Sequence, residues 1–230
     1  MKKIFFVAVL AFASVMAYAQ PRAIGGRLGS SEAISYQHSL GESNMVEVEL
    51  GWSFGAYVNG AGRIKNSAYA ASATDTKLKY NLFGSTFQAA CTYDWIDPLG
   101  KKIPWEHKGE WHWYLGAGAV TGVGWNDYLN IYAKNPTTNK YEYVSPYMSI
   151  SQSTTKAWGY LAAAGRAGVE YDFWFPLQLS VDFRPALGLA FVDNPMYQDK
   201  MPKLMPKTQV GFYWHIYDLA LSVRYRFKTK

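Results

Sequence analysis

Hydrophobic and polar residues alternate along several stretches of the chain, most clearly over residues 177–191. There the odd positions are apolar, whereas the even positions carry Gln, Ser, Asp, Arg, Ala or Gly. Successive side chains of a β-strand point to opposite faces, so this period of two predicts strands with one apolar face and one small or charged face. The same alternation occurs over residues 22–29, 32–40, 45–55, 78–95, 110–125, 158–173 and 217–227. The pattern therefore predicts an all-β fold with eight strands.

The links between these runs alternate in length. On one side of the predicted sheet they cover residues 41–44, 96–109 and 174–176, and on the other side residues 30–31, 56–77, 126–157 and 192–207. Short turns on one side and long loops on the other are typical of outer-membrane barrels. The apolar parity also reverses between Leu82 and Phe83, which predicts a bulge or a protrusion beyond the bilayer. We therefore predict an eight-stranded antiparallel up-and-down transmembrane β-barrel with short periplasmic turns and three long extracellular loops.

The volume of a barrel indicates which face points outward. The interior of an eight-stranded barrel is just wide enough to be filled by side chains, and the apolar faces of the eight runs, rich in Trp, Phe and Leu, would overfill it. The other faces combine small residues with charges of both signs, and Arg makes forked hydrogen bonds to carboxylates in confined places. We therefore predict a charge network in the lumen, made of Arg27, Glu47, Glu49, Asp94, Glu110, Arg166, Glu170, Asp172, Asp182, Arg184, Asp218, Arg224 and Arg226.

Aromatic residues of the apolar face gather near the predicted strand ends. Amphipathic rings favour the headgroup level of a membrane, where they form two girdles around a barrel. The predicted periplasmic girdle contains Tyr93, Trp95, Trp111, Trp113, Tyr171, Phe173, Tyr225 and Phe227, and the opposite girdle contains Trp52, Phe54, Trp125, Phe191 and Tyr217.

The composition excludes a polytopic helical membrane protein and a disordered chain. Of the 230 residues, 49% are hydrophobic and 17% aromatic, yet the mean hydropathy is −0.17 and the longest apolar stretch lies at the N-terminus. That stretch follows Lys2 and Lys3 and ends in Ala17-Tyr18-Ala19 before Gln20, a layout typical of a cleaved secretory signal. We expect residues 1–19 to be removed and residues 20–230 to form one outer-membrane barrel domain.

Charge and cysteine content narrow the partners. Without Lys2 and Lys3 the formal net charge falls from +6 to +4, a mild excess that predicts no nucleic-acid partner. Cys91 is the single cysteine, so the exported fold has no internal disulfide.

Four segments carry a family resemblance: Ala23-Ile-Gly-Gly-Arg-Leu-Gly29, Ile34-Ser-Tyr-Gln-His38, Val46-Glu-Val-Glu-Leu-Gly-Trp52 and Leu219-Ala-Leu-Ser-Val-Arg-Tyr-Arg-Phe227. With them, the chain from residue 20 onward resembles the small eight-stranded outer-membrane β-barrel proteins of Gram-negative bacteria, the OmpA/OmpX-like group. The resemblance implies a place in the outer membrane and contact with its lipids. It also implies recognition by the barrel assembly machinery through a last strand whose alternate hydrophobic residues end in Phe227.

Two glycine motifs point to other chemistry. Gly51-Trp52-Ser53-Phe54-Gly55 matches the G-x-S-x-G pattern of hydrolases, but that motif requires a sharp strand-to-helix turn. Here the alternation of a strand runs through it, which favours Ser53 as a small lumen residue. The segment from Gly116 to Gly122 lacks the spacing of a nucleotide-binding loop, so glycine in a curved barrel strand is the simpler interpretation.

Histidines and paired carboxylates complete the candidates. His38, His107, His112 and His215 occur in different segments without metal-ligand spacing, which favours structural or interfacial roles. Ser39 beside His38 faces the opposite way, so the pair does not converge as a lipid-modifying site would require. Glu47 and Glu49 share a face about 7 Å apart and could bind a cation or act as acid and base, but pairing with lumen arginines is the favoured interpretation. We therefore expect no catalytic residue, no metal site and no cofactor.

The sequence favours a non-enzymatic outer-membrane barrel with a side-chain-filled lumen. Such a barrel would support the cell envelope, and its loops at residues 56–77, 126–157 and 192–207 could contact a surface ligand or mediate adhesion. Three alternatives stay open: a small passive channel, a lipid-modifying enzyme, and a soluble periplasmic ligand-binding barrel with the two faces inverted.

Overall fold

The computed structural model describes residues 20–64, 76–99, 109–135, 137–143, 157–193 and 208–227. No helix in these ranges is long and apolar enough to cross a membrane. All strands belong to one antiparallel sheet. They are β1 (Gln20–Gly29), β2 (Ser31–Ser39), β3 (Asn44–Ile64), β4 (Thr76–Pro98), β5 (Glu110–Lys134), β6 (Tyr141–Tyr143), β7 (Ala157–Asp172), β8 (Leu177–Phe183), β9 (Ala186–Asp193), β10 (Thr208–His215) and β11 (Leu219–Arg226).

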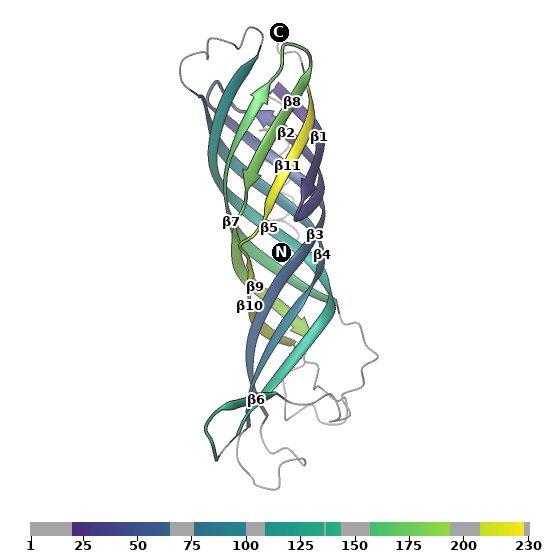
Figure 1. Cartoon of the computed structure of the whole chain (residues 1–230), viewed down its shortest axis with the longest axis vertical. Coiled ribbons are helices and arrows are strands. Elements are labelled where there is room, and N and C mark those ends of the chain that lie inside the picture. Colours follow the sequence, from purple (N-terminus) through teal and green to yellow (C-terminus); the bar gives the residue numbers. More distant parts are fainter. Residues whose placement is uncertain are drawn as a thin grey trace, which may run out of the picture.

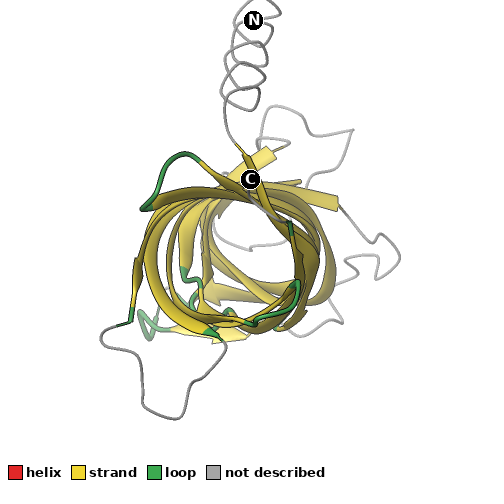
Figure 2. Ribbon diagram, turned by 90° about the horizontal axis from the view of Figure 1, so that it is seen from above, coloured by secondary structure: helices red, strands yellow, loops and turns green. Residues whose placement is uncertain are grey.

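At one end of the molecule, eight strands close the sheet into a barrel. The order around the ring is β11, β1, β2, β3, β4, β5, β7 and β8, and pairing of β8 with β11 closes it. Figure 2 shows the ring from above. We call this the turn end, because the tight connections at residues 40–43 and 173–176 lie there; it is the upper end in Figure 1. The predicted eight-stranded antiparallel barrel is confirmed.

Toward the opposite end, which we call the loop end, the ring narrows to six strands. β1 and β2 have only 10 and 9 residues, whereas β3 has 21, so the β1–β2 hairpin stops partway along β3. Beyond the hairpin, β10 pairs directly with β3, with Trp214 opposite Tyr57. The ring there consists of β3, β4, β5, β7, β9 and β10, and β9 and β10 lie in the lower half of Figure 1. The lumen is therefore narrower at the loop end.

The predicted strand at residues 177–191 is divided into β8 and β9 at the level where the ring narrows, and β10, which was not predicted, precedes β11 there. β8 and β9 are separated by Arg184 and Pro185, because proline has no N–H to donate to the ladder. β10 and β11 are separated by residues 216–218, and the Arg184 N–H donates to the Asp218 carbonyl at 2.8 Å, so the two breaks lie side by side. On the turn side of the two breaks, β11 therefore pairs with β1 and β8, and on the loop side β10 pairs with β3 and β9.

The predicted boundaries of the loops at residues 56–77 and 126–157 were wrong. β3 continues to Ile64, β4 begins at Thr76, and β5 continues to Lys134, where it pairs with β6. Two register shifts hid these extensions, one between Ser53 and Ala56 and one between Phe83 and Gly84. A bulge moves the alternation by one residue, and the first one contains Gly55 at a φ of 83°, a conformation that favours glycine. The second accounts for the parity reversal that predicted a bulge there.

Glycines on the inner face of the barrel make room for aromatic rings across the β5–β7 ladder. Three register pairs join a glycine to a large ring: Gly168 with Tyr114, Gly122 with Tyr160, and Gly124 with Trp158. A Cβ placed on Gly168 would lie 2.5 Å from the Tyr114 ring, and one on Gly124 would lie 2.2 Å from the Trp158 ring. Glycine is required at these positions because the aromatic ring of the paired residue packs directly on the glycine backbone.

Gly168→Ala is expected to destabilise the barrel by about 1–3 kcal/mol, because the new methyl group must displace the enclosed Tyr114 ring. A urea titration of the purified protein, followed by tryptophan fluorescence, measures the change. Gly159→Ala on the same strand is the matched control, because its Cβ would find its nearest contact at 3.8 Å. Equal stability of the two variants would contradict the packing role of Gly168.

Candidate functional site

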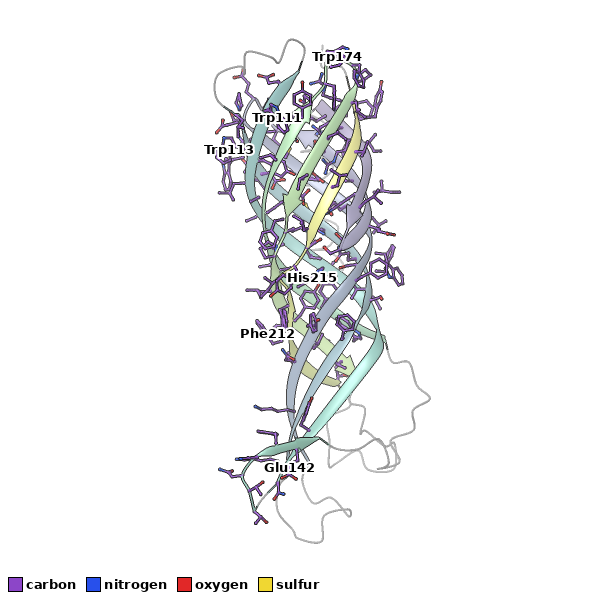
Figure 3. All side chains as sticks on the ribbon, in the orientation of Figure 1. Trp111, Trp113, Glu142, Trp174, Phe212 and His215 are labelled. Atoms are coloured by element: carbon purple, nitrogen blue, oxygen red, sulfur yellow. The ribbon has the colours of Figure 1, made fainter. Side chains whose placement is uncertain are left out.

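Large apolar side chains cover the outer wall of the barrel. Ile34, Leu28 and Leu161 are 67%, 59% and 58% exposed. Their neighbours along the strands point inward, and Ser35 and Arg27 are completely buried. The apolar face is thus the outer one, and the small and charged face lines the lumen. Figure 3 shows the side chains on both faces of the ribbon.

The first group of lumen charges surrounds Glu47 of β3. Arg166 of β7 contacts one oxygen of the Glu47 carboxylate at 2.6 Å, and Arg224 of β11 contacts the other at 2.7 Å. Arg166 also pairs with Asp94 at 2.9 Å and with Asp182 at 3.2 Å. All five side chains are fully buried. One arginine therefore compensates carboxylates from three different strands.

The second group lies beside the first and is joined to it through Asp182. Arg27 of β1 contacts Glu49 at 3.1 Å, Asp182 at 2.9 Å and Asp218 at 3.1 Å. Arg184 donates two hydrogen bonds to Asp218 Oδ2, from Nε at 3.0 Å and from Nη2 at 2.8 Å, and it also pairs with Glu49. The interpretation of Glu47 and Glu49 as partners of lumen arginines agrees with these contacts.

These ion pairs affect the stability of the barrel and the register of its strands. Desolvation offsets much of the Coulomb attraction of a buried ion pair, so such a network adds little net stability but makes the loss of any one partner costly. Each arginine bridges strands that are distant in sequence, and the network therefore favours one register around the ring. Its side chains all lie buried inside the eight-stranded half.

An aromatic layer fills the six-stranded half. Tyr160 and Tyr213 stack with ring centroids 4.1 Å apart and planes 11° apart, and Trp158 packs 5.7 Å from Tyr160. These rings are buried with Val58, Ala190 and other small residues in one cluster. The sequence holds a signal for two of them, since Trp158 and Tyr160 share the parity of Arg166. We did not predict the layer, because rings were assigned to the outer face.

A third ionic cluster lies inside the turn end. Arg22 pairs with Glu170 and lies 3.8 Å from Asp172, and Arg226 contacts Asp172 at 3.0 Å. A cavity of about 400 Å³ opens beside it, lined in part by Arg22, Asp172 and Arg226 together with Trp174. The structure thus places Glu170, Asp172 and Arg226 together, but separately from the two groups deeper in the lumen.

Two placements at the turn end differ from the predicted network. Arg22 was not predicted, because its parity places it outside; a register shift between Pro21 and Ala23 turns it inward. Glu110 was predicted in the lumen, but its side chain is 59% exposed at the start of β5. That prediction was wrong, since a residue at the rim keeps its charge in water whatever its parity.

Ser53 and His215 meet inside the barrel, which their sequence positions did not indicate. Ser53 Oγ lies 3.4 Å from His215 Nδ1, near Asp218. Both side chains are buried, and Asp218 is held by Arg27 and Arg184. β3 continues as a strand from Ser53 through the bulge to Ile64, so the motif lacks the strand-to-helix elbow that presents a nucleophile to substrate.

The predicted girdle residues fall into two sets. At the turn end, Tyr93, Trp95, Trp113 and Tyr225 are exposed on the outer wall, while Trp111, Tyr171, Phe173 and Phe227 are half-buried. Trp111, Trp113 and Trp174 mark this end in Figure 3. Trp52, Phe54 and Tyr217 lie where the ring narrows, because β3 extends beyond them, and Phe191 lies near the end of β9.

Several predicted features lie outside the described residues. These are Ala17 and Ala19 of the signal, His107, the side chain of Trp125, and residues 65–75, 144–156 and 194–207 of the predicted loops. Of the loop end, the structure describes the β5–β6 hairpin, where the Lys79 ammonium group lies 4.3 Å from the Tyr141 ring centroid. Glu142 marks this hairpin in Figure 3.

Comparison of the chain with known proteins finds no match among family models, curated proteins or solved structures.

Proposed function

We propose that the protein is a non-enzymatic integral outer-membrane β-barrel with a closed lumen, which supports the envelope and carries surface loops. The observation that supports this most is the direction of the two faces. A soluble barrel hides its apolar face inside, whereas this barrel exposes Leu, Ile, Val and Phe side chains around its wall and buries arginines and carboxylates. Monomeric soluble proteins rarely expose contiguous apolar patches larger than a few hundred Å².

The height of the apolar wall supports a membrane as its surroundings. On β7 the outward positions from Gly159 to Tyr171 carry only apolar residues or tyrosine. This span corresponds to about 30 Å when the strand is tilted by about 45°, close to the apolar band of about 25 Å on outer-membrane barrels. The exposed rings at the turn end suit the headgroup level of the inner leaflet. Outer-membrane lipids are therefore the first partner that we propose.

The buried side chains inside the barrel favour a closed lumen over a passive channel. Paired charges occupy the wider half and stacked rings the narrower half. On β11, Tyr225 points outward next to Phe227 in the pattern expected of an assembly signal. We propose that the barrel assembly machinery reads this strand, and that any specific ligand binds at the loop end.

Cell fractionation tests the membrane assignment. We expect the protein in the detergent-extracted envelope. We also expect its gel mobility to change on boiling, because a membrane barrel stays folded in the unheated detergent sample and unfolds when boiled. Release of the protein by osmotic shock as a freely soluble species would contradict the proposal. In planar bilayers, the purified protein is expected to give no stable single-channel currents, and large steady currents would instead favour a channel.

A further inference from the structure

The ladder between β5 and β7 places three potential metal ligands on one inner surface at the turn end. His112 of β5 lies directly opposite Glu170 of β7 in the register, and Asp172 follows Glu170 by two residues on the same face of its strand. One ligand atom from each of the three side chains lies within 4.8 Å of the others. Because sheet geometry fixes two of these positions across a ladder and the third along a strand, the three side chains converge without any loop.

Two of the converging atoms are buried with no hydrogen-bond partner in the part of the chain that the structure describes. Glu170 is completely buried, and its Oε1 is held by Arg22, but its Oε2 has no hydrogen-bond partner among the described residues. His112 Nδ1 is likewise buried without a hydrogen bond, 3.9 Å from Asp172 Oδ2. A buried carboxylate oxygen or ring nitrogen that makes no bond costs free energy. An ion seated between these atoms would remove that cost.

The carboxylates around these atoms outnumber the arginines, so the net charge of the cluster is negative. Arg22 and Arg226 compensate Glu170 and Asp172, and Glu110 adds a further carboxylate 3.8 Å from His112 Nε2. Asp172 Oδ1 accepts a hydrogen bond from Gln178 at 3.1 Å, and an ion would share Asp172 Oδ2 with Arg226 Nη1, which lies 3.0 Å from it. The adjoining cavity at the turn end is lined by Asp172 together with Arg22 and Arg226.

From these observations we infer that His112, Glu170 and Asp172 bind one Zn²⁺ ion inside the turn end of the barrel. Imidazole nitrogen suits Zn²⁺, whereas sites for Ca²⁺ and Mg²⁺ are built from oxygen ligands alone. Three protein ligands would leave one position of a tetrahedral ion for water or another ligand. The ion would clamp β5 to β7 at the end where the ladder begins. This inference departs from the expectation, drawn from sequence spacing, that the chain has no metal site.

Zinc titration of the purified full-length protein in detergent, after removal of metals with a chelator, tests the inference. We expect calorimetry to show saturable binding of one Zn²⁺ per chain at micromolar concentration, with no displacement by excess Ca²⁺ or Mg²⁺. His112→Ala and Glu170→Gln are each expected to weaken binding by about tenfold or more, since even residues that only orient metal ligands contribute that much. His38→Ala, which removes an imidazole bonded to Tyr36 on β2, is expected to bind as the wild type does.

X-ray absorption spectroscopy of the zinc-loaded wild type provides a readout that does not depend on any variant. The expected spectrum contains one imidazole nitrogen and carboxylate oxygens at about 2.0–2.2 Å. Absence of saturable binding, unchanged affinity in both ligand variants, or a spectrum without an imidazole ligand would each overturn the inference. Gel mobility of the unheated variants reports whether their barrels are intact.

Discussion

Arg166→Met is expected to destabilise the barrel by about 3–5 kcal/mol, because it removes one cation from a buried network and leaves its partners uncompensated. The Arg166 guanidinium contacts Glu47, Asp94 and Asp182, all fully buried. Glu47 retains Arg224 and Asp182 retains Arg27, but Asp94 keeps no other cation among the described residues. A urea titration of the folded protein in detergent, followed by tryptophan fluorescence, measures the change.

Two further variants make the test specific. Arg226→Met removes a cation whose side chain is 34% exposed, and Asp172 keeps Arg22 at 3.8 Å, so a smaller change is expected. Adding Asp94→Asn to Arg166→Met is expected to restore part of the loss, because it removes the charge that lost its partner. If Arg166→Met proved as stable as Arg226→Met, the lumen network would not have the energetic role described here.

Tyr213→Ala is expected to destabilise the barrel by about 3 kcal/mol or more, in the range found when a large buried ring is truncated. Tyr213 is fully buried in the narrow half, where it stacks on Tyr160 and also packs against Trp158. Its loss would leave a void beside the Tyr160 and Trp158 rings. The same urea titration in detergent gives the free energy of unfolding.

Phe212→Ala is the matched control for this prediction. Phe212 is the preceding residue of β10, but its side chain is 50% exposed on the outer wall. Truncation there leaves no internal void, so we expect less than half the effect of Tyr213→Ala. The reverse order of stabilities would show that the outer wall, not the aromatic layer, holds the loop end together.

The inner and outer faces could be predicted because the side chains of a strand alternate strictly. Arg27, Glu47 and Arg224 share their parity with small residues, and the structure buries all three. The prediction fails where a bulge or a rim interrupts the alternation. Arg22 turns inward at a register shift, and Glu110 stays in water at the start of its strand.

The contacts within the lumen could not be predicted in the same way. Glu47 meets Arg166 and Arg224, which follow it by 119 and 177 residues. Which inward side chains meet depends on strand tilt, register and the diameter of the ring, and none of these can be read from one strand. For the same reason, the spacing of His112, Glu170 and Asp172 in the sequence gave no sign of a three-residue cluster.

The sequence by itself determined the all-β class, the eight strands and the face on which most charges lie, because each depends on a local period of two along the chain. Tertiary structure alone decided that the ring narrows from eight strands to six. The β1–β2 hairpin is shorter than β3, and where the hairpin ends, β10 takes its place beside β3. A strand's length has this effect only through the strands next to it. Tertiary structure also decided which charges pair and which rings stack, since those contacts join strands that become neighbours only when the barrel closes.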